Sequence, residues 1–201
     1  MRTRFIGIAW ATLVLIAPAY GDAIFTRGNH PQPGEQNVLF LTDMSGSTVT
    51  GHTNKSHTPV TFTSTTDILT AKGGQSDIDA ADGFINDITI SVAGHTFQDL
   101  IINPFKPVSA NDLMVTVVTN MGTLTLTYGG THGNNFLTIE TDGTQTISSV
   151  TIDSASGFQD LKQTRISGIS GVTIVPEPSS LLLLGIGVLG LAGVVRRKLT
   201  T

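Results

Sequence analysis

Between residues 37 and 173 the chain consists of short segments rich in Val, Ile, Thr and Phe, separated by Gly, Asn and Asp. In residues 123–128, Leu124, Leu126 and Tyr128 alternate with three threonines, which is the two-residue period of a half-buried strand. No segment shows a helical period. We expect strands at 38–42, 60–64, 88–92, 100–103, 113–119, 123–128, 136–140 and 145–152, so the body is predicted to be all-β.

Two turn signals indicate how the strands connect. Asn120-Met121-Gly122 separates two expected strands, and Asp142-Gly143 follows another, so both are predicted as hairpin turns between antiparallel neighbours. Residues 24–174 are therefore predicted to form a two-sheet β-sandwich of jelly-roll or Greek-key type. A barrel and a solenoid stay open as alternatives, and the strand order does not follow from the sequence.

The amino end has the three parts of a secretory signal peptide. Arg2 and Arg4 precede an apolar run at residues 5–17, and Ala17-Pro18-Ala19 supplies small residues for signal peptidase. The apolar run is too short to span a hydrocarbon core of about 30 Å. Residues 1–21 are therefore predicted to be removed by signal peptidase during secretion, after Ala19 or Gly21.

The carboxyl end, residues 175–201, also has three parts. Pro176-Glu177-Pro178 forms an extended segment, residues 181–195 are uninterruptedly apolar, and Arg196-Arg197-Lys198 follows. As a helix, the apolar run is about 22 Å long, which makes 181–195 a marginal transmembrane helix. The basic residues stop the helix and stay on the cytoplasmic side, so the body is expected outside.

This order of parts resembles the PEP-CTERM sorting signal of Gram-negative bacteria. The resemblance implies that an exosortase, a membrane-embedded cysteine protease and transpeptidase, recognises Pro176, Glu177 and Pro178. It also implies a link to exopolysaccharide production. The protein is then expected to be anchored transiently in the inner membrane and to reach the cell surface or the extracellular space. A tail anchor that is never cut stays open as an alternative.

Charge and cysteine content exclude several functions. The formal net charge is -4, and residues 24–175 contain 13 acidic and 6 basic residues, without a run of Lys or Arg. This body lacks the basic patch that nucleic-acid binding requires. The absence of cysteine excludes disulfides, thiol catalysis and Cys-ligated zinc.

The body contains no reactive motif, so we predict a protein that is not an enzyme and has no catalytic residues. G-x-S-x-G and H-E-x-x-H are both absent, and the five histidines lie scattered through polar segments. Aspartates such as Asp99, Asp153 and Asp160 are not assigned as a glycosidase pair, because any β protein contains such carboxylates and their separation in space does not follow from the sequence. No cofactor is predicted.

One acidic segment is a weak calcium candidate. Asp77, Asp79 and Asp82 are expected in one loop, which could offer carboxylate oxygens to the ion. The segment lacks the glutamate at the twelfth position of an EF-hand loop, where Ile88 stands. A solvated turn is the alternative interpretation.

A short repeat marks two places in the body. Phe-Gln-Asp-Leu occurs at residues 97–100 and again at 158–161, each time after a β-branched triplet. We expect each Phe and Leu to enter the core where a loop returns to a strand. Each aspartate, Asp99 and Asp160, is expected to cap the turn.

These observations favour an exported, non-catalytic protein of the cell surface or extracellular matrix, sorted by an exosortase-type system and associated with exopolysaccharide. The alternative is a calcium-assisted carbohydrate-binding module. Aromatic platforms for sugars are scarce, because after Ala19 the chain has no Trp and only Tyr20 and Tyr128.

Overall fold

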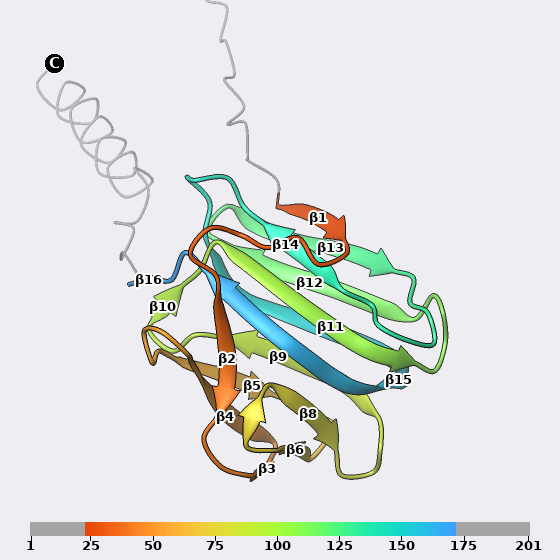
Figure 1. The fold of residues 1–201 in the computed structure, drawn as a ribbon. Coiled ribbons are helices and arrows are strands. Elements are labelled where there is room, and N and C mark those ends of the chain that lie inside the picture. Colours follow the sequence, from red (N-terminus) through yellow and green to blue (C-terminus); the bar gives the residue numbers. More distant parts are fainter. Residues whose placement is uncertain (1–22, 172–201) are drawn as a thin grey trace, which may run out of the picture. The chain divides into compact units, whose positions relative to one another are not determined.

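The computed structural model describes residues 23–171, which form strands and turns without a helix (Figure 1). The chain divides into two units, at residues 1–169 and 170–201. The strands of the first unit are β1 (Ile24–Arg27), β2 (Gln36–Phe40), β3 (Met44–Gly46), β4 (Thr48–Thr53), β5 (Pro59–Thr63), β6 (Leu69–Ala71), β7 (Gly74–Gln75), β8 (Asp77–Ala80), β9 (Ile85–Ser91), β10 (His95–Thr96), β11 (Asp99–Pro107), β12 (Leu113–Thr119), β13 (Gly122–Tyr128), β14 (Leu137–Glu140) and β15 (Ile147–Ser167). β16 (Ser170–Gly171) begins the second unit.

The all-β prediction is confirmed, and each of the eight expected strands overlaps an observed one. The alternation is also confirmed, because Tyr128 is buried and Leu124 and Leu126 are half-buried, whereas the threonines between them are exposed. The expected strand at 145–152 is only the beginning of β15, which continues for 21 residues to Ser167. Several short strands, β6, β7 and β8 among them, were not expected from the pattern.

The long strand β15 joins most of the fold together. Its first half pairs with β9 on one side and β12 on the other, and its second half pairs with β11, β8 and β2. Between the halves, the register with β9 shifts from Asp153 to Phe158. Gly157 lies in this shift with φ of 81°, and a Cβ there would stand 2.8 Å from the Cβ of Phe84. Glycine is therefore required at the change of neighbours.

Hydrogen bonds connect fourteen strands, along the path β1-β14-β11-β15-β9-β5-β4-β2-β7 with side branches. Because β2 also pairs with β15, strands β15, β9, β5, β4 and β2 form a closed circuit of pairings (Figure 1). β15 belongs to this circuit and also pairs with β11 and β12, so the strands are not divided into two separate hydrogen-bonded sheets. The two-sheet arrangement and its jelly-roll or Greek-key topology stay a prediction.

The core consists of the inward-facing residues of these strands. The largest fully buried side chains include Phe62, Phe97, Phe158, Ile85, Ile88, Ile90, Leu100 and Leu113. Burying side chains of this size stabilises each by roughly 1.5–3 kcal/mol relative to exposure. This apolar core holds the domain together without disulfides.

One predicted hairpin is confirmed and the other is wrong. Asn120 and Met121 connect β12 to its neighbour β13, with Thr119 opposite Gly122. Asp142 does form a turn, because its Oδ1 accepts hydrogen bonds from the amides of Thr144 and Gln145. However, the strands around it do not pair, since β11 lies between β14 and β15.

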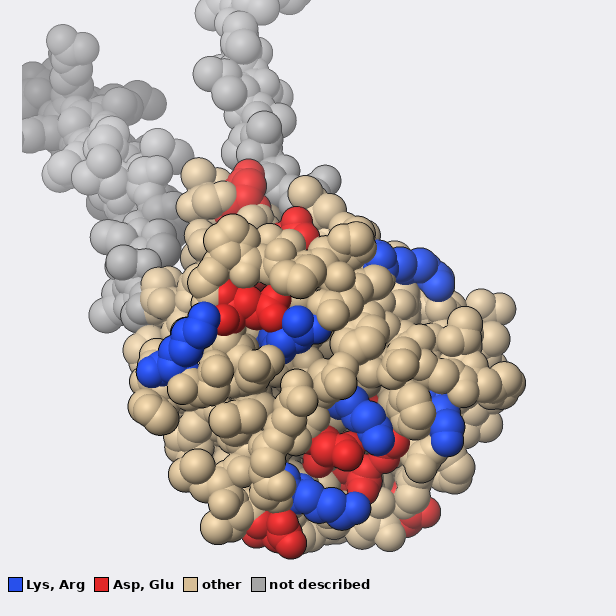
Figure 2. Space-filling model, in the orientation of Figure 1, with Lys and Arg blue, Asp and Glu red and all other residues tan. Residues whose placement is uncertain are grey.

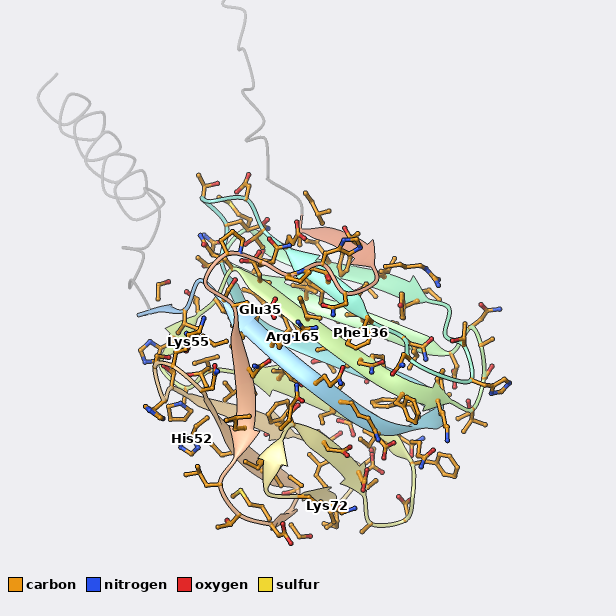
Figure 3. All side chains as sticks on the ribbon, viewed as in Figure 1. Glu35, His52, Lys55, Lys72, Phe136 and Arg165 are labelled. Carbon is orange, nitrogen blue, oxygen red and sulfur yellow. The ribbon has the colours of Figure 1, made fainter. Side chains whose placement is uncertain are left out.

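A half-buried ion pair fastens the segment before β2 to β15. The Arg165 guanidinium lies 2.7 Å from Glu35 Oε1 and also donates to the side chain of Asn29. The Lys55 ammonium group donates to the backbone carbonyl of Glu35 at 2.9 Å. Figure 3 shows Arg165 and Glu35 close together on this face of the domain.

The predicted signal peptide, residues 1–21, and the predicted sorting signal, residues 175–201, lie outside the described residues, and so does the transmembrane helix expected at 181–195. Within residues 23–171 we found no helix long and apolar enough to cross a membrane.

Candidate functional site

Three carboxylates come together where β8 lies beside the second half of β15. Single ligand atoms of Asp77, Asp79 and Asp160 lie within 4.8 Å of one another, and Asp160 stands directly opposite Asp79 in the strand register. We call these three residues the acidic cluster. Figure 2 shows acidic and basic side chains next to one another on the face that contains these strands.

Two lysines neutralise part of the acidic cluster. The Lys162 ammonium group lies 3.2 Å from Asp160 Oδ2 and 3.6 Å from Asp77 Oδ1, and the Lys72 ammonium group lies 3.8 Å from Asp79 Oδ2. Burial and the neighbouring Asp160 raise the pKa of Asp79 to about 7. The pKa of Lys162 is also raised, because its carboxylate partners outweigh its burial. The charge of the acidic cluster is therefore partly neutralised, by a proton on Asp79 at pH values below about 7 and by the ammonium groups of Lys72 and Lys162.

The structure corrects the expected calcium loop. Asp77 and Asp79 belong to strand β8, where residues two apart share a face, and not to a loop. Asp82 lies in the turn after β8 and accepts a hydrogen bond from the Phe84 amide, apart from the cluster. The third member is Asp160, which is 81 residues from Asp79 in the chain and therefore had no local signal.

For the repeated Phe-Gln-Asp-Leu segment, the prediction is confirmed for the phenylalanines and leucines and is wrong for the aspartates. Both phenylalanines and both leucines are fully buried, as predicted. The aspartates, however, lie within strands and do not cap turns: Asp99, in β11, accepts a hydrogen bond from the Ser167 hydroxyl, and Asp160 belongs to the acidic cluster. The repeat drew attention to Asp160, but the interpretation of this residue as a turn cap was wrong.

A second group of carboxylates lines a pocket of about 480 Å³. The pocket lies at the start of β9 and β12 and within β15, where Met114, Asp153 and Asp87 stand opposite one another in register. Its lining is completed by Thr65, Thr66, Asn86, Asp112, Ser154 and Ala155. We call it the Asp153 pocket, and it combines three carboxylates with hydroxyl and amide groups.

Asp87 has mainly a structural role in this pocket. Its carboxylate accepts hydrogen bonds from the Ser64 hydroxyl at 2.7 Å and from the Thr65 and Thr66 amides at 3.0 Å. Burial opposes its ionisation, but these bonds and those from the threonine hydroxyls outweigh burial and lower its pKa to about 2. Asp87 is therefore ionised at neutral pH, and its hydrogen bonds hold the turn after β5.

The other two carboxylates differ from Asp87. Burial and the charge of Asp87 raise the pKa of Asp153. Hydrogen bonds from the hydroxyl and amide of Ser156, together with the Ser154 hydroxyl at 3.0 Å, lower the pKa of Asp112. The pocket therefore offers acceptors of different basicity, which suits the recognition of hydroxyl or cationic groups.

The histidines form no metal site in the part of the chain described. Among residues 23–171, the acidic cluster is the one group of three or more His, Cys, Asp or Glu side chains close enough to share an ion. The Nδ1 atoms of His52 and His95 are buried without a hydrogen-bond partner. Figure 3 places His52 at the edge of the domain, away from Arg165.

Comparison with known proteins adds information on the carboxyl end. A family model described as the PEP-CTERM protein-sorting motif matches residues 175–198, which include the Pro-Glu-Pro segment, the apolar run and the basic residues. No curated protein and no solved structure matches the chain. The match indicates export, transient membrane anchoring and processing by an exosortase-type system.

Proposed function

We propose that this chain, which carries the PEP-CTERM protein-sorting motif, is a non-catalytic protein of the cell surface or extracellular matrix that associates with exopolysaccharide. Its body, residues 24–174, is proposed to be a β-sandwich scaffold. The observation that carries the proposal is the motif match at residues 175–198, together with the signal-peptide pattern at residues 1–21. The Asp87 carboxylate accepts several hydrogen bonds from the turn after β5, which supports a structural role for at least one of the acidic residues.

The sorting route follows from the parts of the carboxyl end. Pro176, Glu177 and Pro178 are recognised by the exosortase, residues 181–195 span the membrane, and Arg196, Arg197 and Lys198 stop and orient the helix. The body is then released to the surface when the anchor is removed.

Replacing Pro176, Glu177 and Pro178 together with alanine tests this route. We expect the full precursor to accumulate in the membrane fraction, because the processing enzyme loses its extended recognition segment. Intact-mass spectrometry of surface and membrane fractions measures the retained tail. The matched control is Ser179→Ala with Ser180→Ala, which leaves the triplet intact, and equal processing of both variants would contradict the proposal.

Glycan binding is a second candidate function, and the Asp153 pocket favours it. Carboxylates, hydroxyls and the exposed Met114 line one open site, and ionised carboxylates are strong acceptors for sugar hydroxyl groups. Assistance by calcium is weakened as a hypothesis, because lysine ammonium groups already lie 3.2 to 3.8 Å from the acidic cluster.

Affinity electrophoresis of the secreted protein tests the second candidate, with hydroxyethyl cellulose as a neutral polymer and alginate as an anionic one. Asp153→Asn removes the charge at nearly constant size. Losing one charge-assisted hydrogen bond should weaken binding roughly tenfold or more. Asp82→Asn, in an exposed turn, is the control. Retarded migration that changes with calcium but not with Asp153→Asn would assign binding elsewhere.

A further inference from the structure

The strand register aligns a row of six threonines across one face of the domain. Thr125 lies opposite Thr116, Thr116 opposite Thr151, and Thr151 opposite Thr89. The row continues through Thr63 on β5 to Thr48 on β4. It therefore crosses the six consecutive strands β13, β12, β15, β9, β5 and β4 without interruption.

A second row runs parallel to the first, two residues further along each strand. Its members are Thr123, Val118, Ser149, Ser91, Thr61 and Thr50. Five of these six side chains carry a hydroxyl group. We call the two rows together the threonine face.

The threonine face points toward solvent. All twelve of its side chains are half-buried or exposed, whereas the residues that alternate with them, such as Val49, Phe62, Ile90, Val117 and Val150, are buried. Neighbouring hydroxyls in the first row are bonded to one another, at 2.8 Å between Thr89 and Thr151 and at 3.2 Å between Thr48 and Thr63. Sheet geometry spaces the side chains about 4.8 Å apart across strands and about 6.7 Å apart between rows.

The threonine face carries no charged residue, in contrast to the rest of the body. Residues 24–175 contain 13 acidic and 6 basic side chains, and none of them belongs to the two rows. An anionic polymer would be repelled by the acidic body, and a cationic one would concentrate at the Asp153 pocket. The charge distribution thus complements a neutral partner.

The composition of the threonine face also distinguishes between kinds of neutral partner. Protein interfaces are enriched in Tyr, Trp, Phe, Met and Arg and are depleted in Ser, and the two rows contain none of those five residue types. A threonine pairs a hydroxyl with a methyl group and has a stiff χ1 angle, so little side-chain entropy is lost on contact. Hydroxyl and methyl groups at regular spacing match the hydroxyl groups and C–H surfaces of a sugar chain.

We propose that the threonine face binds an extended, neutral polysaccharide, which lies across the strands and passes beside the Asp153 pocket. The pocket and the face are continuous, because Met114, Asp153 and Asp87 form the next row on β12, β15 and β9. This inference deepens the glycan-binding function proposed above and rests on it. Each contact is weak, so binding depends on a chain long enough to touch many of them.

The test compares the secreted protein with the variant Thr89→Ala, Thr151→Ala, in affinity electrophoresis with hydroxyethyl cellulose and in calorimetry with cellotetraose. Removing two central hydroxyls should weaken polymer binding roughly tenfold, at about one neutral hydrogen bond each. The short oligosaccharide should bind far more weakly than the polymer. The control variant, Thr26→Ala with Thr70→Ala, removes two hydroxyls from strands outside the face and should bind as the unaltered protein does.

Each other outcome has a distinct meaning, provided that circular dichroism shows equal melting of the variants. Binding lost in Asp153→Asn but kept in Thr89→Ala, Thr151→Ala would overturn the threonine face and leave the pocket as the glycan site. An unaltered protein that binds neither polymer would overturn glycan binding itself. Self-association through the face, or shaping of ice crystals without polymer binding, would assign the face to another occupant and overturn the inference.

Discussion

The two halves of β15 carry different surfaces. In the first half, Ser149 and Thr151 align with hydroxyl-bearing neighbours on β9 in two uncharged rows, and Asp153 stands opposite Asp87 in the next row. In the second half, Asp160 stands opposite Asp79, and Lys162 bridges two carboxylates. One strand therefore serves two uncharged rows in its first half and an acidic cluster in its second half. The difference teaches that the residues of β15 and those of the strand opposite them together decide the chemistry of each half.

The largest test of this comparison is Phe158→Ala, at the point where the two halves meet. Phe158 is fully buried next to the register shift, so its removal should cost about 4 kcal/mol of unfolding free energy. Urea denaturation measures the loss. Phe84→Ala, which removes an exposed phenylalanine nearby, is the control and should change little. A small loss in Phe158→Ala would show that the halves are stabilised independently.

A smaller effect is expected from Arg165→Ala in the charged half. The change leaves Glu35 without its half-buried partner, which should cost about 2 kcal/mol. Thermal unfolding at low and high salt measures it. Replacing both partners, with Arg165→Met and Glu35→Gln in one variant, should recover part of the lost unfolding free energy, because no charge is then left unpaired. If the Arg165→Ala variant were as stable as the original protein, the ion pair between Arg165 and Glu35 would not contribute to stability.

A third expected effect is on the pH dependence of stability, and it sharpens the contrast between the halves. The pKa of Asp79 is about 7 in the folded protein and near 4 when unfolded, so the folded state holds the proton more tightly. Stability from this group is greatest below pH 4, falls as pH rises and levels off above pH 7. Asp79→Asn should flatten this part of the profile.

Urea midpoints at a series of pH values from 4 to 8 measure that slope. Asp82→Asn, outside the acidic cluster, should keep the slope of the original protein. Thr151→Ala in the first half should keep it too, since it removes a hydroxyl and no titrating group. An unchanged slope in Asp79→Asn would mean that Asp79 does not hold its proton in the folded state.

Strand positions were largely predictable, because the alternation of apolar and polar residues is a local property. The β12–β13 hairpin followed directly from Asn120 and Met121. The second half of β15 was missed because Gly157 and the charged residues after it are typical of a loop. The acidic cluster was only half predicted: Asp77 and Asp79 are two residues apart, whereas Asp160 meets them through strand pairing alone.

By itself, the sequence determined the all-β class, the alternating faces and the sorting signal that the family model matches at residues 175–198. Those features depend on residues a few positions apart, or on a contiguous segment. Only the tertiary structure decided that Thr48, Thr89 and Thr125 share one row, and that Asp160 joins Asp79. Such alignments depend on non-local strand pairing, in which a shift of one residue would turn every side chain to the opposite face.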